Sequence, residues 1–177
     1  MDKISETQYN NLAKEFGISK SKVKSIDFVE SNGEGFDPKT GKIKIQFEPG
    51  YFKKLTNIVI NNGVENQTKE WIAFNESYKK NPTKAMESTS IGRMQVMGIH
   101  WKRLGFKSVG DMWDFAKDSE ANQLWLGLKF IETDKRLIDA VKAWDTKLVA
   151  YYYNGPNYWV KGYDKKLTAA EIRFRNA

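Results

Sequence analysis

The stretch Val29-Glu30-Ser31-Asn32-Gly33-Glu34-Gly35-Phe36 follows a segment with helical periodicity. Val23, Ile26 and Glu30 fall at positions i, i+3 and i+7, so a helix over residues 21–30 carries Glu30 on its apolar face in the last turn. Shielding from water disfavours the ionised form of a carboxyl group, which raises its pKa toward the range that suits a general acid. The alternative is a solvated glutamate at an ordinary helix end.

Glycines and a strand pattern follow Glu30. Gly33 and Gly35 can adopt backbone angles that end a helix, and they have no side chains that would crowd a ligand. Residues 37–41 have turn chemistry, and the alternation over residues 42–48 predicts a strand. We expect a short β-hairpin after the Glu30 helix, and we expect its inward side chains to be Ile43, Ile45 and Phe47.

Helical patterns dominate the rest of the chain. Capping residues, turn residues and apolar periodicity delimit most of the predicted helices, and the expected caps are Ser5, Ser108, Ser119, Asp134 and Asp145. These cover residues 5–16, 50–60, 65–80, 82–86, 109–117, 120–132, 134–143, 146–153 and 168–175, the last from a capping-box pattern at Thr168–Glu171. Between Ser88 and Gly98 we expect a closely packed turn followed by a short buried helix. The predicted fold class is therefore mainly α with a small β-hairpin, in a single domain over residues 1–177.

The composition excludes several classes of site. Of the 177 residues, 40% are hydrophobic, which is enough to bury a core, and none is cysteine, which excludes disulfides and thiolate metal sites. The one histidine, His100, cannot form a His-rich metal cluster. The composition therefore offers no cysteine-based or histidine-rich metal site.

The charge balance favours an anionic partner. The formal net charge is +7, from 29 Lys and Arg against 22 Asp and Glu, which suits nucleic acid, an acidic membrane surface or a bacterial wall. The basic residues are scattered, and the sequence has no zinc-finger, helix-turn-helix or aromatic RNA-binding signature. Because the N-terminus lacks a signal-peptide pattern and no apolar run reaches the length of a membrane span, we expect a cytoplasmic protein without stable membrane insertion.

Three motifs, in order, carry a resemblance to known enzymes. Glu30-Ser31, Ser90-Ile91-Gly92-Arg93-Met94-Gln95 and Tyr153-Asn154-Gly155 resemble the Glu-Ser, Gly-Leu-Met-Gln and Ala-Tyr-Asn motifs of goose-type lysozymes and lytic transglycosylases. The chain is more closely similar to the N-acetylmuramidase family of phage endolysins, with matching motifs at Val29–Phe36, Phe47–Phe52, Ser88–Gly98 and Tyr153–Pro156. The resemblance spans nearly the whole chain. Gly50 stands where the family usually has His, and Ile91 where it often has Trp.

The resemblance implies a lysozyme-like fold that cleaves the β-1,4 bond between N-acetylmuramic acid and N-acetylglucosamine in peptidoglycan. Glu30 matches the catalytic glutamate, which protonates the leaving glycosidic oxygen. Gln95 matches a residue that lines the cleft, and Tyr153 matches one whose hydroxyl lies near the catalytic carboxylate, where it can orient Glu30. Asn154 either contacts a sugar acetamide or caps its own helix.

A second carboxylate must assist if the reaction is hydrolysis. Glu48 is the first candidate, because a lysozyme-like cleft lies between the Glu30 helix and the hairpin strand that ends at Glu48. It can equally pair with Lys42, Lys44 or Arg93, and the lesser candidates are Asp37, Glu34 and Glu87. Without a carboxylate placed to activate water, the 6-hydroxyl of the substrate would attack and form a 1,6-anhydro sugar, as in the lytic transglycosylases. We expect hydrolysis.

The resemblance also implies a partner and a place of action. We expect a monomer that needs neither a metal nor an organic cofactor and that binds bacterial peptidoglycan through its cleft, with no separate wall-binding domain. A wall-cleaving enzyme without an export signal suits a phage endolysin, which is made in the host cytoplasm and reaches the wall in the periplasm after another protein permeabilises the membrane. The rival hypotheses are a catalytically inactive glycan-binding module and a nucleic-acid binder, whose affinity would fall steeply with salt.

Overall fold

The computed structural model describes residues 3–31 and 34–175, which pack as two compact units. Residues 34–127 form the sheet unit, and residues 3–31 together with residues 128–175 form the helical unit. Helices make up most of both units, and the sheet unit contains a three-stranded antiparallel sheet. The predicted fold class, mainly α with a small β element, is confirmed. A single catalytic domain over residues 1–177 stays a prediction.

The helical unit is built from helices whose starts are marked in the sequence. Ser5 caps the first helix as predicted: its hydroxyl accepts from the Gln8 amide at 3.2 Å, and the Gln8 side chain accepts from the Ser5 amide at 2.8 Å. Asp134 and Asp145 also cap helices, as predicted. The elements are α1 (Glu6–Phe16), α2 (Lys20–Ser31), the end of α7 (Glu120–Glu132), α8 (Lys135–Ala143), α9 (Thr146–Asn154), the 3-10 helix η2 (Tyr158–Lys161) and α10 (Tyr163–Arg175).

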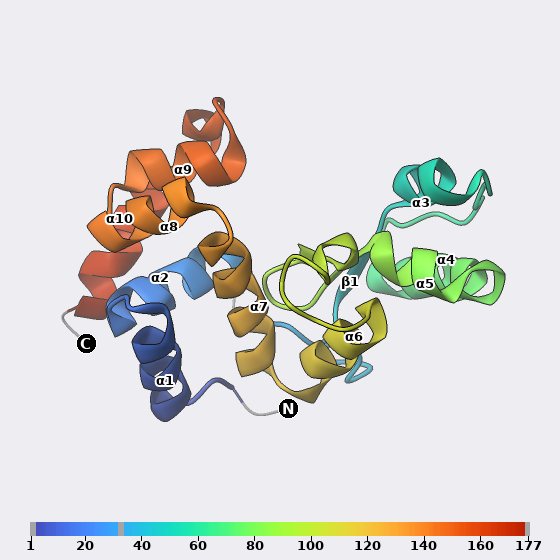
Figure 1. Ribbon diagram of the computed structural model, residues 1–177, viewed down its shortest axis with the longest axis horizontal. Helices are drawn as coiled ribbons and strands as arrows, with labels where there is room; N and C mark the ends of the chain where they lie inside the picture. The colour runs from blue at the N-terminus through green and yellow to red at the C-terminus, as the bar shows by residue number, and fades with distance from the viewer. Residues whose placement is uncertain (1–2, 32–33, 176–177) are drawn as a thin grey trace. The chain divides into compact units, whose positions relative to one another are not determined.

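Helix α10 packs against α2 and α9 (Figure 1). Val23 of α2 and Leu167 of α10 are both fully buried in the core of this unit. The prediction that the final helix begins at a Thr168 cap is wrong, because the helix already begins at Tyr163. The Thr168 hydroxyl donates instead to the Asp164 carbonyl at 3.0 Å, a bond that a continuous helix accommodates.

The sheet unit is built around a three-stranded sheet, in which the strands lie in the order β1-β2-β3. Strand β1 (Ile45–Phe47) pairs with β2 (Thr89–Ile91), which places Ile45 opposite Ile91, and β2 pairs with β3 (Val96–Met97). The remaining elements are α3 (Pro49–Thr56), α4 (Gln67–Lys80), α5 (Pro82–Glu87), the 3-10 helix η1 (Gly98–His100), α6 (Val109–Asp118) and the start of α7.

The hairpin predicted after the Glu30 helix is present. Phe36 and Ile43 form an antiparallel bridge, and the Asp37 amide donates to the Lys42 carbonyl at 2.8 Å across the intervening turn. The predicted inward side chains are at most 3% exposed: Ile43, Ile45 and Phe47. The alternation of this stretch therefore identified its buried face correctly.

Two other segments differ from their predictions. Residues 88–98 form the β2–β3 hairpin and then η1, whereas the sequence indicated only a turn and a short buried helix. The turn is present, but strands of three and two residues are too short to show an alternating pattern. The helix predicted over residues 50–60 ends at Thr56, because Asn57 adopts a left-handed conformation (φ 61°) and β-branched residues follow it.

A buried polar network explains why residue 35 is a glycine. The Glu120 carboxylate accepts from the Gly35 amide and from Arg93 Nη1, both at 2.8 Å, and Gln123 Oε1 accepts from the Arg93 amide at 2.8 Å. A Cβ on Gly35 would lie 1.8 Å from Gln123 Oε1. Gly35 therefore permits close packing inside the sheet unit. The helix stop expected at Gly33 lies outside the described residues.

Candidate active site

Glu30 lies in the last turn of α2, half-buried in the helical unit. The Tyr163 hydroxyl donates a hydrogen bond to Glu30 Oε1, and the Tyr153 hydroxyl lies near the same carboxyl group and interacts with it more weakly. Burial raises the pKa of Glu30 above its ordinary value, while the two tyrosine hydrogen bonds favour the ionised form and oppose that rise. The net direction is upward, which is the direction that a general acid working near neutral pH needs.

The two tyrosines lie together beside Glu30. Their rings are stacked, with centroids 6.0 Å apart and planes 12° apart. Burial is the main cause that raises the pKa of both hydroxyls, and the nearby charge of Glu30 raises it further. Tyr153 and Tyr163 therefore stay protonated and remain hydrogen-bond donors at physiological pH.

Tyr163 is the residue of this group that sequence analysis missed. It lies between the helix that ends near Tyr153 and the one predicted to begin at Thr168, where the sequence indicates no element. Its local signal is weak: an aromatic residue follows Gly162, whose left-handed backbone (φ 60°) ends η2. Glu30 and Tyr163 are 133 residues apart in the chain, so the packing of α10 against α2 is what brings them together.

Asp27 is a second buried carboxylate on α2, one turn before Glu30. Its Oδ2 accepts from the Tyr9 hydroxyl at 2.5 Å, and its Oδ1 accepts from the Ser31 hydroxyl at 3.1 Å. These bonds satisfy a buried polar group and join α1 to the last turn of α2. Asp27 thus supports the segment that carries Glu30.

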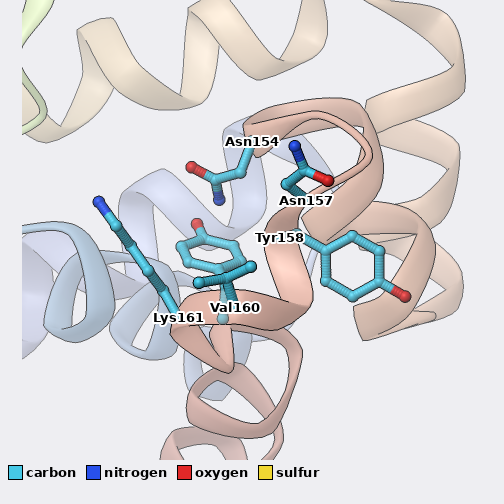
Figure 2. A pocket seen from close by; sticks show the side chains of 6 residues that line it. Asn154, Asn157, Tyr158, Val160 and Lys161 are labelled. Atoms are coloured by element: carbon cyan, nitrogen blue, oxygen red, sulfur yellow. The ribbon is translucent and has the colours of Figure 1, made fainter.

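A pocket of about 320 Å³ adjoins this group on the helical unit. Its lining consists of Asn154, Asn157, Tyr158, Val160, Lys161 and Tyr163. Figure 2 shows the side chains of Asn154 and Asn157 near each other, with Lys161 toward one side of the view and Tyr158 toward the other. Tyr163 both lines the pocket and bonds Glu30, so it connects the pocket to the candidate acid, which is not itself part of the lining.

Asn154 is exposed in this pocket, and within the described residues its side chain has no hydrogen-bond partner. The end of α9 is made by the backbone instead, since the Gly155 amide donates to the Tyr151 carbonyl at 2.9 Å. Of the two roles that the sequence left open for Asn154, the side chain is not used as a helix cap. Contact with a sugar acetamide stays a prediction.

Glu48 lies in the sheet unit, between the end of β1 and the start of α3. It is half-buried, and its Oε1 accepts from Gln46 Nε2 at 2.9 Å. The cations that the sequence offered as partners have other contacts: Lys44 bonds Glu34 at 2.6 Å, Arg93 bonds Glu120 at 2.8 Å, and Lys42 lies over the Trp71 ring. The role of Glu48 in catalysis stays a prediction.

The lesser candidates for the second carboxylate all have structural contacts. Asp37 Oδ1 accepts from the Lys39 amide at 2.8 Å within the hairpin turn. Glu34 forms the ion pair with Lys44. Glu87 is 5% exposed and accepts from Lys84 Nζ at 2.6 Å and from Trp101 Nε1 at 3.0 Å. These contacts agree with turn, surface and core roles.

Gln95 lies in the turn between β2 and β3 of the sheet unit. Its backbone is left-handed (φ 48°), which is uncommon for a residue other than glycine. Its side chain is exposed, and Nε2 donates to the Gly92 carbonyl at 2.7 Å. A strained backbone at an exposed polar residue is often found at functional sites. The place of Gln95 in the substrate cleft stays a prediction.

The described residues provide neither a cluster of metal ligands nor a membrane-spanning helix. Among residues 3–31 and 34–175, no group of three or more His, Cys, Asp and Glu residues can hold a metal ion. Over these same residues, none of the helices has the length and apolar character that crossing a membrane requires.

Comparison of the chain with known proteins identifies a family and a similar solved structure. The family described as N-acetylmuramidase matches residues 19–175, which include every candidate site residue. The crystal structure of the Burkholderia AP3 phage endolysin is similar, with a TM-score of 0.91 and 27% sequence identity over 99% of this chain and 73% of that chain. No curated protein matches. The lysozyme-like fold expected from the motifs is confirmed, and the chain belongs to the N-acetylmuramidase family.

Proposed function

We propose that the protein is a peptidoglycan-degrading endolysin that cleaves the β-1,4 bond between N-acetylmuramic acid and N-acetylglucosamine, with Glu30 as general acid. The observation that carries this proposal is the half-buried Glu30 carboxyl, whose pKa is raised by burial and which two tyrosine hydroxyls contact. The glycosidic oxygen leaves readily only if it is protonated as its bond breaks. A carboxyl group that holds its proton near neutral pH can supply that proton.

Tyr153 and Tyr163 stabilise the negative charge that forms on Glu30 when it transfers its proton. When Glu30 gives up its proton, a carboxylate forms in a position shielded from water. The two hydroxyls then donate to it, and each hydrogen bond to a charged group contributes about 1.5–3 kcal/mol. The pair therefore offsets part of the desolvation that keeps Glu30 protonated before the reaction.

The remaining roles follow from the family motifs. We propose Glu48 as the carboxylate that activates the attacking water, and Gln95 and Asn154 as residues that bind the sugar chain. Two observations support these assignments: among the described residues Glu48 forms no salt bridge, and the Asn154 amide has no partner within the protein. The proposed reaction uses neither a metal nor an organic cofactor.

The likeness to a phage endolysin supports a route to the wall. We propose that the protein is made in the host cytoplasm and acts as a monomer on peptidoglycan once another protein has permeabilised the membrane. The net charge of +7 attracts it to an anionic wall.

The test is mass spectrometry of the fragments released from purified peptidoglycan. Hydrolysis by this route leaves a reducing muramic-acid end, whereas attack by the substrate's own 6-hydroxyl leaves a 1,6-anhydro end that is lighter by one water. We expect reducing muramic-acid ends from the wild type and none from Glu30→Gln. Anhydro ends would reject hydrolysis and the role of Glu48. Absence of glycan fragments, with salt-sensitive binding to nucleic acid, would reject the enzyme assignment.

A further inference from the structure

The pocket beside Tyr163 presents polar groups that have no partner in the described part of the protein. The Asn154 and Asn157 amides, the Tyr158 hydroxyl and the Lys161 ammonium form no hydrogen bond or ion pair there. Some lysines of the helical unit are paired with carboxylates, such as Lys20, Lys24 and Lys135, whereas Lys161, like Lys166, forms no ion pair within the described residues. An unpaired ammonium at the edge of a pocket is available to an anionic ligand.

The size and lining of the pocket limit what it can hold. Its volume of about 320 Å³ is at the lower end of the range for small-molecule sites, which is about 300–1,000 Å³. That space suits one or two amino-acid residues or a single sugar substituent. The two asparagine amides can donate to and accept from amide bonds, while Val160, which is 66% exposed, offers apolar surface to an alkyl group.

We propose that this pocket binds the peptide stem of the muramic acid at the cleaved bond. This inference rests on the proposed function, because the muramic acid that loses its leaving group must lie beside Glu30. Its stem begins with an amide bond on the lactyl group and carries free carboxylates further along. The Asn157 amide matches a peptide bond of the stem, and the Lys161 ammonium matches a stem carboxylate.

Tyr163 makes the connection between pocket and acid. Its ring forms part of the pocket wall, and its hydroxyl bonds Glu30 Oε1. A group held in the pocket is therefore separated from Glu30 by the Tyr163 side chain, which is close enough for it to belong to the sugar being cleaved. The unpaired cation favours the stem over an N-acetylglucosamine ring, which is uncharged. The pocket thus selects stem-bearing muramic acid.

The test compares two substrates prepared from the same glycan strands. One retains its peptide stems, and the other has lost them to an N-acetylmuramoyl-L-alanine amidase, which leaves a free lactyl carboxylate. The value of kcat/KM for each is measured by the release of reducing ends, and the readout is the ratio of the two values. We expect the wild type to prefer the stem-bearing strands and this preference to weaken as salt screens the ion pair.

Lys161→Met should lower the ratio about fivefold, which corresponds to ~1 kcal/mol, the upper value for an exposed ion pair. The matched control is Lys166→Met, which removes an exposed lysine of α10 outside the pocket and should leave the ratio unchanged. An unchanged ratio in Lys161→Met, an equal fall in both variants, or a higher ratio through loss of binding to the free lactyl carboxylate would overturn the inference.

The results with the wild type distinguish failure of stem recognition from failure of the proposed function. If it releases reducing muramic-acid ends equally well from both substrates, stem recognition fails and the proposed function stands. If it releases none from either substrate, the proposed function fails and the inference fails with it.

Discussion

Removal of the Tyr163 hydroxyl perturbs the candidate acid with the least change in packing. In Tyr163→Phe the aromatic ring can keep its stack on Tyr153, while the hydrogen bond to Glu30 Oε1 is lost. That bond favours the ionised carboxyl group, so its loss raises the pKa of Glu30 further. A general acid works only while it is protonated, so the decline of activity with rising pH should move to higher pH.

The size of the effect follows from the environment of the bond. A hydrogen bond to a charged group contributes about 1.5–3 kcal/mol, and the half-buried position of Glu30 favours the lower figure. A loss of ~1.4 kcal/mol in stabilisation of the carboxylate formed during proton transfer corresponds to a rate about tenfold lower. We therefore expect Tyr163→Phe to be up to about tenfold slower at the wild-type optimum, with a broader alkaline range.

The assay is kcat/KM on solubilised peptidoglycan from about pH 4 to pH 9. Tyr153→Phe should shift the profile in the same direction but by less, because its hydroxyl favours the ionised carboxyl group less than the Tyr163 hydroxyl does. Tyr151→Phe is the matched control: Tyr151 is on the same helix and is 48% exposed, so its variant should keep the wild-type profile. A Tyr163→Phe profile identical to the wild type, or one shifted to lower pH, would refute the reasoning.

Three further predictions concern stability, measured by thermal or denaturant unfolding. Because burial raises the pKa of Glu30, the folded state binds that proton more tightly, so wild-type stability falls as pH rises from the ordinary value of 4.5 through the folded pKa. Glu30→Gln has no such proton to lose, so the difference between its Tm and that of the wild type should rise with pH over this range. Parallel curves of Tm against pH for the two proteins would contradict this prediction. Gly35→Ala should lose about 2–4 kcal/mol by displacing a buried, hydrogen-bonded glutamine, whereas Gly50→Ala, with open space around it, should gain up to ~1 kcal/mol. Glu120→Gln removes the buried carboxylate that pairs with Arg93 Nη1 and should lose ~3 kcal/mol, against less than ~1 kcal/mol for Lys135→Gln at an exposed ion pair; equal losses would contradict this.

Helix starts could be read from the sequence because their chemistry is local. The hydroxyl of Ser108 accepts from the Asp111 amide at 3.0 Å, three residues along the chain, and Asp145 accepts from the Leu148 amide at the same spacing. Such bonds depend on neighbours in sequence, so a capping residue ahead of an apolar period is enough to predict them.

Elements that depend on distant partners could not be read in this way. Strand β2 is three residues long and exists through its pairing with β1, more than forty residues earlier in the chain. Thr168 has the pattern of a cap but lies inside a helix, because packing on α2 and α9 stabilises α10 from Tyr163 onward. Local preference was overridden by tertiary contacts in both cases.

The candidate site likewise contains residues with a local sequence signal and residues that depend on distant contacts. Glu30 and Tyr153 lie in ordered motifs, and helical spacing put Glu30 on the apolar face of its helix while leaving a solvated glutamate as the alternative. Tyr163 has no motif, and its bond to Glu30 depends on two helices from opposite ends of the chain. The second carboxylate, for which Glu48 is proposed, is defined by a separation in space, which residue order does not encode.

The central claim is that Glu30 delivers the proton that breaks the sugar bond, and the rate of reducing-end release by Glu30→Gln tests it most directly. General acid catalysis contributes about 10²–10⁴-fold, so the variant should lose at least that factor while it still unfolds cooperatively at neutral pH. Asp139→Asn, which changes an exposed carboxyl group of the same unit, should keep the wild-type rate. A folded Glu30→Gln variant that works within about threefold of the wild type would contradict the claim.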